Sequence, residues 1–383
     1  MIYADYNGSA PLSNEVREYL LKRFEKGPFA NPNAIHYLGT KTLMGMENAR
    51  AVCAKILGAD FDQIIFNSGA TEGISTIFHT ILSEEKNKKI IIVSGIEHSA
   101  ILNTAQHYAN RGFTLKCLPV SSDGIVDIIT LAKWIKEESS NIAMVAVMAA
   151  NNETGVIQPY FEINSLCLKN NIPYLCDTTQ FIGKTPFNFK ESNIEYAVCS
   201  GHKLGALPGT GILLVKNPDK LLPLIIGGGQ EKGHRGGTQN YLGNETLAVA
   251  LTCIEKNFSK IEALTEKRLE FEKKIKAAFP EVVIIEENSP RLATTTYISY
   301  PGIHGQAVQI ELESLDIFVT TSSACSDNMP ITSKVLKAMG TRDDIGRGVV
   351  RISLCLNSPL DYYDNLAVAL TKAYTKLAKV KSF

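Results

Sequence analysis

Short runs of consecutive apolar residues recur along the first two thirds of the chain, and most are followed by a helical stretch. Continuous runs rich in isoleucine and valine are typical of strands that are buried on both faces of a sheet. Because helical stretches separate most of these strands, the pattern predicts an α/β fold with a mostly parallel sheet. Seven runs fit this description: residues 63–68, 89–94, 113–120, 142–150, 172–177, 196–200 and 211–215.

The pattern changes after the glycine-rich segment 227–240, "GGGQEKGHRGGTQN". Residues 244–279 are predicted to form a long, charged helical region that connects two parts of the chain. Beyond it, shorter strand candidates alternate with helical pieces, which is typical of an α+β arrangement. We therefore predict a large α/β domain over 15–255 and a smaller α+β domain formed by 1–14 and 256–383. The candidate strands of the smaller domain are 282–287, 294–300, 316–321 and 349–354.

The composition narrows the class of protein. Of 383 residues, 45% are hydrophobic, and 39 Lys and Arg balance 39 Asp and Glu, so the net charge is zero. Without a basic excess, nucleic-acid binding is disfavoured. No apolar run reaches the roughly 18 residues of a membrane span, and the N-terminus lacks a signal-peptide pattern, which predicts a cytoplasmic location. Eight cysteines form no C-x-x-C pair, so neither a zinc site nor a disulfide framework is indicated.

Polar clusters follow several of the predicted strands, at the sheet edge where open parallel sheets bind ligands. In "NSGATEG" (67–73), Ala70 and Thr71 begin a helix whose free N–H groups favour a phosphate, although an ordinary helix cap has the same pattern. The segment "FIGKT" (181–185) resembles the end of a nucleotide P-loop, but position 178 is threonine where that motif needs glycine. The spacing therefore excludes a P-loop.

Lys203 follows a strand in "SGHK" (200–203), opposite Asp177 at the end of another strand. A lysine beside an acid and a phosphate site suits a Schiff base to pyridoxal phosphate, and a crowded, dry pocket would help it lose its proton. Ser200 and His202 would add donors to the phosphate. Asp177 would keep the ring nitrogen protonated, so that the ring accepts electrons from the substrate Cα; the alternative is a structural acceptor.

Four further residues are candidates for chemistry, each with a structural alternative. His98 begins a helix and could stack on an aromatic ligand and move protons, or be structural. Asn152 could direct its amide into the same crevice or form an Asx turn. Arg351, flanked by apolar residues, suits a substrate carboxylate or a structural ion pair. Cys325 lies among small polar residues (320–330), which predicts an exposed loop with a nucleophilic thiolate or a harmless surface cysteine.

The order and spacing of these motifs resemble the cysteine desulfurase family, the NifS/IscS-like branch of the class-V aminotransferases with fold type I. The resemblance covers nearly the whole chain. The motifs that carry it are "NPNAIH", "FNSGATEG", "IEHSAIL", "ANNETGVIQP", "CDTTQ", "SGHK", "GGGQEKGHRGGTQN", "SSAC", "VLKAMG" and "RISL".

This resemblance implies a role for each candidate residue. Lys203 would carry pyridoxal phosphate, Asp177 would contact the ring nitrogen, Gln180 the phenolic oxygen, and His98 would stack on the ring and assist proton transfer. Thr238 would reach the phosphate of a second subunit, which implies a homodimer with shared active sites. Asn152 and Arg351 would bind the substrate carboxylate, and Cys325 would be the nucleophile. The phosphate would be held by Ala70, Thr71, Ser200 and His202.

The implied reaction converts L-cysteine to L-alanine and leaves a persulfide on Cys325, whose sulfur passes to an acceptor such as an iron–sulfur scaffold protein. The alternative enzyme is a selenocysteine lyase, or another class-V lyase or transaminase. The alternative without enzymatic activity is a catalytically silent protein that binds a sulfur acceptor. The chain departs from the family's usual pattern at "DYNGSAPL", "GHKLGALPG", "TTSSAC" and "CLN". These departures leave the proposed catalytic residues in place and indicate a divergent paralogue.

Overall fold

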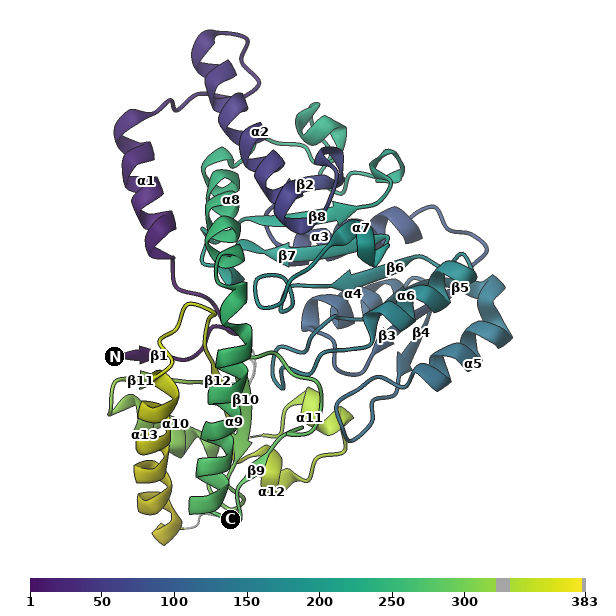
Figure 1. Ribbon diagram of the computed structural model, residues 1–383. Coiled ribbons are helices and arrows are strands. Elements are labelled where there is room, and N and C mark those ends of the chain that lie inside the picture. The colour runs from purple at the N-terminus through teal and green to yellow at the C-terminus, as the bar shows by residue number, and fades with distance from the viewer. Residues whose placement is uncertain (322–330, 381–383) are drawn as a thin grey trace.

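A computed structural model describes residues 1–321 and 331–380 and places a seven-stranded sheet at the centre of the larger part of the molecule (Figure 1). Every strand predicted for this sheet is present, and only β8 runs antiparallel to its neighbours. The predicted α/β fold with a mostly parallel sheet is therefore confirmed. In spatial order the strands are β2 (Ile64–Asn67), β8 (Gly211–Val215), β7 (Tyr196–Ser200), β6 (Tyr174–Asp177), β5 (Ile142–Ala146), β3 (Ile90–Ser94) and β4 (Thr114–Leu118).

Helices cover both faces of this sheet, which explains the continuous apolar runs. Along β3, Ile90 and Ile92 belong to the hydrophobic core on one face, while Ile91 and Val93 belong to the core on the other. Successive side chains of a strand point to opposite faces, so both sets must be apolar when both faces are buried. The helices of this part are α1 (Asn14–Lys26), α2 (Tyr37–Leu57), α3 (Ala70–Leu82), α4 (Ser99–Ala109), α5 (Ile128–Glu138), α6 (Tyr160–Lys169), α7 (Phe189–Ser192) and α8 (Tyr241–Glu255).

The smaller part is built around a three-stranded antiparallel sheet in the order β12-β10-β9, with a two-stranded parallel pair, β1 and β11, beside it. Ile2 and Ala4 of the N-terminal segment share its hydrophobic core with Ile352 and Leu366. The predicted division of the chain at residues 14 and 255 stays a prediction. The elements are β1 (Ile2–Tyr3), α9 (Ile261–Ala278), β9 (Val283–Ile284), β10 (Thr295–Ser299), α10 (Gly305–Glu313), β11 (Ile317–Phe318), α11 (Lys334–Ala338), α12 (Asp343–Gly346), β12 (Val349–Ser353) and α13 (Tyr362–Leu377).

The long helix predicted over 244–279 is in fact two helices, α8 and α9, so that prediction was wrong in this respect. Asn257 leaves the helical conformation, with φ −103° and ψ 1°, and its side-chain amide donates to the carbonyl of Cys253 at 2.8 Å. An asparagine side chain that satisfies a free carbonyl competes with continuation of the helix. The two helices follow one another down the middle of the molecule, α8 against the larger part and α9 in the smaller part (Figure 1).

The N-terminal segment passes between the two parts and contacts both. Tyr6 N donates to Ser353 O at 3.1 Å, at the end of β12, while Ala10 N donates to His202 O at 2.8 Å, just beyond β7. The segment therefore lies across the sheet edge at which the predicted polar clusters gather. This path brings residues 5–9 into the candidate site.

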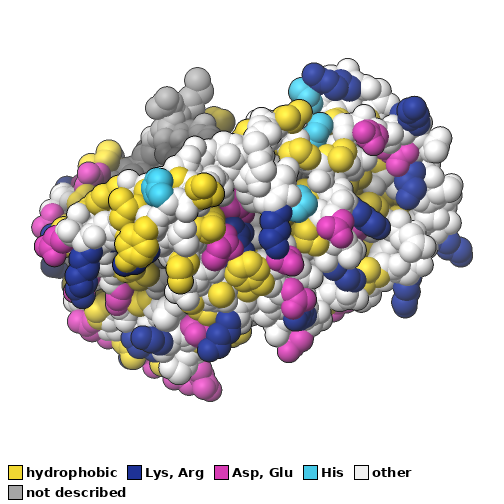
Figure 2. All heavy atoms as spheres, turned by 90° about the horizontal axis from the view of Figure 1, so that it is seen from above, with side chains coloured by type: hydrophobic (Ala, Val, Ile, Leu, Met, Phe, Trp, Pro, Cys, Tyr) yellow, Lys and Arg dark blue, Asp and Glu magenta, His cyan; other side chains and the backbone are white. Residues whose placement is uncertain are grey.

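The surface shows no single-sign charged area on the face seen in Figure 2, where Lys, Arg, Asp and Glu side chains are interspersed with exposed hydrophobic side chains. Among the helices in residues 1–321 and 331–380, none combines the length and the apolar character that crossing a membrane requires. Within the same ranges, no group of three or more His, Cys, Asp or Glu side chains is arranged to hold a metal ion.

Candidate functional site

The turn from β2 into α3 forms a cradle suited to a phosphate. Gly69 has a φ of 147°, which is accessible to glycine and rare for other residues, and an added Cβ there would lie 3.3 Å from Ser200 Oγ. Ala70 N donates to Ser200 Oγ at 2.8 Å, and Thr71 is exposed in the first turn of α3. The free N–H groups at the start of a helix attract an anion. The structure thus brings Ala70, Thr71 and Ser200 together.

Lys203 lies in the 3-10 turn Gly201–Lys203 that follows β7. Its Nζ donates to the carbonyl oxygens of Asn7 at 2.7 Å and Gly8 at 2.5 Å, so the N-terminal segment covers it. Burial, together with the positive charge of Arg351, lowers the pKa of Lys203 to about 8 from the ordinary 10.5. A lysine amine with this pKa is partly neutral near neutral pH, as a nucleophile or a base must be.

A second buried lysine, Lys184, lies beside the first. Its Nζ donates to Asn7 Oδ1 at 2.5 Å and also to Gln180 Oε1, and the residue is buried. Gln180 in turn donates through Nε2 to Asn7 O at 2.9 Å. Burial, Lys203 and Arg351 hold the pKa of Lys184 well below its usual range. Asn7 therefore links Gln180 and both lysines in one network.

Asp177 ends β6 as a buried carboxylate, and its Oδ1 accepts from Thr179 N at 2.9 Å. Glu97 is buried nearby and accepts from Ser94 Oγ at 2.5 Å and from Met148 N at 3.0 Å. Burial raises the pKa of Glu97 to about 8, and the negative charge of Asp177 contributes to this shift. A pKa of about 8 keeps most of the Glu97 carboxyl groups protonated at neutral pH.

Two histidines lie just beyond strands of the sheet, His98 after β3 and His202 after β7. His98 is the exposed N-cap residue of α4, and its Nδ1 accepts from Ala100 N at 3.1 Å. His202 Nδ1 lies 3.2 Å from Ser9 Oγ. Burial, Lys203 and His98 lower the pKa of His202 to about 4, so His202 is neutral at neutral pH. These influences relate His202 to both Lys203 and His98.

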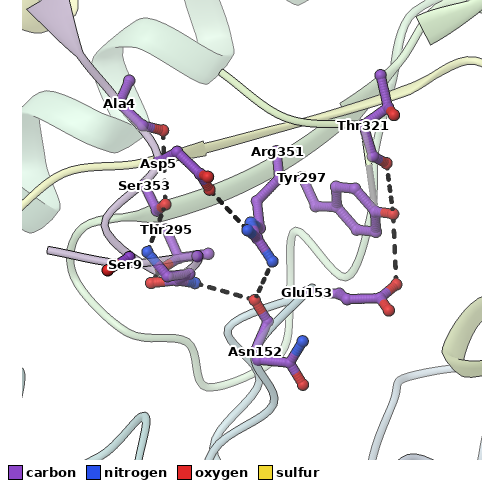
Figure 3. Close-up of polar contacts among 12 residues, drawn as sticks. Ala4, Asp5, Ser9, Asn152, Glu153, Thr295, Tyr297, Thr321, Arg351 and Ser353 are labelled. Atoms are coloured by element: carbon purple, nitrogen blue, oxygen red, sulfur yellow. Dashed lines mark hydrogen bonds and ion pairs between the residues drawn. The ribbon is translucent and has the colours of Figure 1, made fainter. Parts of the chain in front are cut away.

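Arg351 lies in the middle of β12 and makes two polar contacts (Figure 3). Nη2 contacts Asp5 Oδ1 at 2.6 Å, and Nη1 donates to the main-chain carbonyl of Asn152 at 2.9 Å. The side-chain amide of Asn152 points away from the guanidinium in this view. Asn152 therefore contacts Arg351 through its main chain, and its predicted contact with a substrate carboxylate stays a prediction.

A further polar chain runs from Glu153 to Thr321, the last described residue before 322–330. Tyr297 Oη lies 3.4 Å from Glu153 Oε2 and donates to Thr321 O at 3.1 Å (Figure 3). Burial raises the pKa of Glu153, and Ser333, Arg351 and Tyr297 oppose this shift. Glu153 is thus influenced by residues on both sides of 322–330. Cys325 itself lies outside the described residues.

Thr238 is the remaining candidate, and the structure does not bring it into contact with Lys203. It is exposed in the loop between the turn Gln230–Gly233 and α8. A role toward a second subunit stays a prediction.

Three residues of the site were missed by the sequence reasoning: Asp5, Asn7 and Lys184. Asp5 and Asn7 lie in an N-terminal stretch without strand or helix periodicity, so nothing in the local pattern indicates that it returns to the crevice. The sequence around Lys184 resembles only the end of a P-loop, and the spacing excludes that motif. The signal that could have found it is its position four residues after Gln180, beyond the end of a buried strand.

These residues fit pyridoxal phosphate. The cradle at Gly69 and Ala70 suits the phosphate, and Asp177 offers a buried carboxylate to a cationic ring nitrogen. Among the described residues, Thr179 Oγ1 is buried without a hydrogen-bond partner, which leaves a free polar group beside Asp177. Lys203 supplies the amine that would hold the aldehyde.

Comparison with known proteins gives a consistent result. Residues 2–366 match the family model described as "Aminotransferase class-V". "Cysteine desulfurase IscS" of Dictyoglomus turgidum is 31% identical over 385 residues, covering 100% of this chain and 96% of the relative. A solved structure described as "NIFS-LIKE PROTEIN" has a TM-score of 0.90 at 32% identity, covering 98% of this chain and 100% of that one. Another, "SspA in complex with cysteine", has a TM-score of 0.81 at 28% identity, covering 94% and 100%.

Proposed function

Because this chain belongs to the class-V aminotransferase family, we propose that it is a pyridoxal-phosphate-dependent cysteine desulfurase, which converts L-cysteine to L-alanine and transfers the sulfur to Cys325. One observation carries the proposal: the Lys203 amine, with its pKa lowered to about 8, lies in the crevice with Asp177 and Arg351 acting on it electrostatically. A relative solved with cysteine supports the choice of substrate.

Each part of the cofactor has a partner in this crevice. Ala70, Thr71, Ser200 and His202 would hold the phosphate, and Thr238 of a second copy would complete that site. Asp177 would hold the ring nitrogen protonated, since its carboxylate is buried and the neighbouring Glu97 is expected to stay neutral. Gln180 would contact the phenolic oxygen, and its orientation is fixed by Lys184 and Asn7. His98 would lie against the ring.

When bound, pyridoxal phosphate stabilises negative charge that develops at the substrate Cα. Lys203 is the base that removes the Cα proton, because its amine is neutral in about a tenth of the molecules at pH 7 when its pKa is about 8. Arg351 would hold the substrate carboxylate and so orient the Cα–H bond toward Lys203.

The thiolate of Cys325 then attacks the sulfur of the substrate. A new S–S bond forms as the substrate Cβ–S bond breaks, and the electron pair of that bond stays with the carbon, which takes up a proton to become the methyl group of alanine. Cys325 is left as a persulfide. A sulfur-acceptor protein, such as an iron–sulfur scaffold, would take the outer sulfur atom.

A homodimer is part of this proposal. Exposed apolar side chains gather around the end of α1, the start of α2 and the loop before α8, and a second copy would cover them. They are Phe24, Phe29, Ile35, Tyr37, Leu38, Met44, Leu224, Ile225 and Ile226. The loop that carries Thr238 continues from this region, which supports its contribution to the partner's site.

The function is tested by incubating the purified protein with L-cysteine and a reducing thiol. We expect L-alanine and sulfide in equal amounts. Other amino acids should react more slowly or give no product. Pyruvate in place of alanine would contradict a desulfurase and indicate a different lyase, and faster turnover of L-selenocysteine would favour the selenocysteine lyase.

The lowered pKa of Lys203 predicts how cofactor capture depends on pH. Only the neutral amine attacks the aldehyde, so the rate of pyridoxal phosphate uptake by the apoprotein should rise with pH and level off above about 8. The measurement is stopped-flow absorbance across this range. In the Arg351→Gln variant the midpoint should move upward, because a positive neighbour is removed. A wild-type midpoint near the 10.5 of an ordinary lysine would contradict the prediction.

A further inference from the structure

We propose that Asp5 occupies the place of the substrate carboxylate on Arg351, so that each substrate molecule must displace it and its presence sets the affinity of the site for carboxylates. The inference rests on the proposed function, in which Arg351 receives the substrate carboxylate. It adds an internal competitor, supplied by the N-terminal segment of the same chain.

The contact between the two side chains has the geometry of a ligand and its site. Asp5 Oδ1 lies 2.6 Å from Arg351 Nη2, a short charge-assisted hydrogen bond. Nη1 is held by the carbonyl of Asn152, and the buried Nε has no partner among the described residues. In Figure 3 the Asp5 carboxylate approaches the guanidinium from the side opposite Glu153. It therefore takes one of the donors that a carboxylate ligand needs.

Arg351 is held in a buried strand, whereas the Asp5 side chain is partly exposed. The arginine lies in β12, paired with Tyr297 of β10, and its side chain is 3% exposed. The Asp5 side chain is 25% exposed and follows the two-residue strand β1. A partly exposed carboxylate regains hydration when it turns outward, while the buried guanidinium cannot lose its partner unless another anion replaces it. A ligand carboxylate is such an anion.

Gly8 creates the space in which the Asp5 carboxylate lies. A Cβ added to Gly8 would lie 2.3 Å from Asp5 Oδ2 and 2.9 Å from Asp5 Oδ1, closer than real Cβ atoms come. Gly8 N also donates to Asp5 O at 3.0 Å, which closes the turn that brings the two residues together. Any larger residue at position 8 would push the carboxylate away from its present place. The pairing with Arg351 thus depends on this glycine.

The competition is tested by measuring the dissociation constant of propionate, a carboxylate without amine or thiol, for the holoenzyme by isothermal titration calorimetry. Asp5→Asn removes the competing charge and is expected to bind propionate about tenfold more tightly than the wild type. Gly8→Ala retains the Asp5 carboxylate but displaces it from Arg351, so this variant should also bind propionate more tightly than the wild type. It provides the test if Asp5→Asn fails to fold. Asp361→Asn, which removes an exposed carboxylate elsewhere, is the matched control and should leave the constant unchanged.

The Arg351→Gln variant separates the inference from the proposed function. If Arg351→Gln loses propionate binding while Asp5→Asn and Gly8→Ala bind propionate like the wild type, Asp5 does not compete for Arg351. Arg351 then remains the carboxylate site. Weaker binding by Asp5→Asn would also overturn the competition, since Asp5 would then assist the ligand. If Arg351→Gln binds propionate like the wild type, Arg351 is not the carboxylate site, and both conclusions fall.

Discussion

Replacing Lys203 by alanine is expected to lower kcat/KM for L-cysteine by about 10⁴-fold, because one amine both holds the cofactor and moves the Cα proton. Lys184 cannot take over, although it is buried in the same network. Its Nζ donates to Asn7 Oδ1 and Gln180 Oε1, and these hydrogen bonds hold the Lys184 amine in place. The variant should also lose cofactor on gel filtration, as followed by absorbance.

Two lysine variants serve as controls for this experiment. Lys220→Ala changes an exposed lysine and should keep both cofactor and activity. Lys184→Met should retain covalently held cofactor, because Lys203 is intact. Recovery of a peptide labelled at Lys184 after borohydride reduction of the wild-type holoenzyme would contradict the assignment of Lys203.

Replacing Cys325 by serine is expected to leave the cofactor bound and to lower sulfur transfer by about 10³-fold, because a hydroxyl does not ionise near neutral pH and is a far weaker nucleophile than a thiolate. Sulfide release from L-cysteine and cofactor absorbance are measured on the same preparation. If Cys325→Ser keeps the cofactor colour but loses sulfide release, Cys325 acts in sulfur transfer and is not needed to hold the cofactor.

Cys117→Ser is the control, since Cys117 is an exposed cysteine outside the candidate site. Burial of part of its side chain and the nearby Glu97 raise the pKa of the Cys117 thiol, which makes it a poor nucleophile. The control should therefore release sulfide like the wild type. Unchanged sulfide release by Cys325→Ser would exclude Cys325 as the nucleophile.

The strands and the residues at their ends were predictable because their signals are local. Burial on both faces produces a continuous apolar run, and parallel strands carry whatever follows them to the same edge of the sheet. Asp177, Ser200, His202 and Lys203 were identified in this way, and the structure places each at the end of β6 or β7 or directly after it. The break between α8 and α9 was missed because one asparagine side chain decides it, within a sequence that otherwise favours helix.

The N-terminal contribution to the site could not be predicted, because its contacts join residues that are far apart in the sequence. Asn7 holds Lys184 and Lys203, and Asp5 pairs with Arg351 across nearly the whole length of the chain. Propensity and periodicity describe local structure and carry no information about such pairs. For the same reason the sequence indicated Asn152 as a polar residue of the crevice but not that its main-chain carbonyl holds Arg351.

In the proposed function, sulfur leaves L-cysteine by way of Cys325. This route is tested by mass spectrometry of the intact holoenzyme and its peptides after brief incubation with L-cysteine in the absence of reductant. We expect the peptide that contains Cys325 to gain one sulfur atom while an equal amount of L-alanine appears in solution. L-alanine formed while that peptide stays unmodified, or a sulfur atom gained on another cysteine alone, would contradict this route.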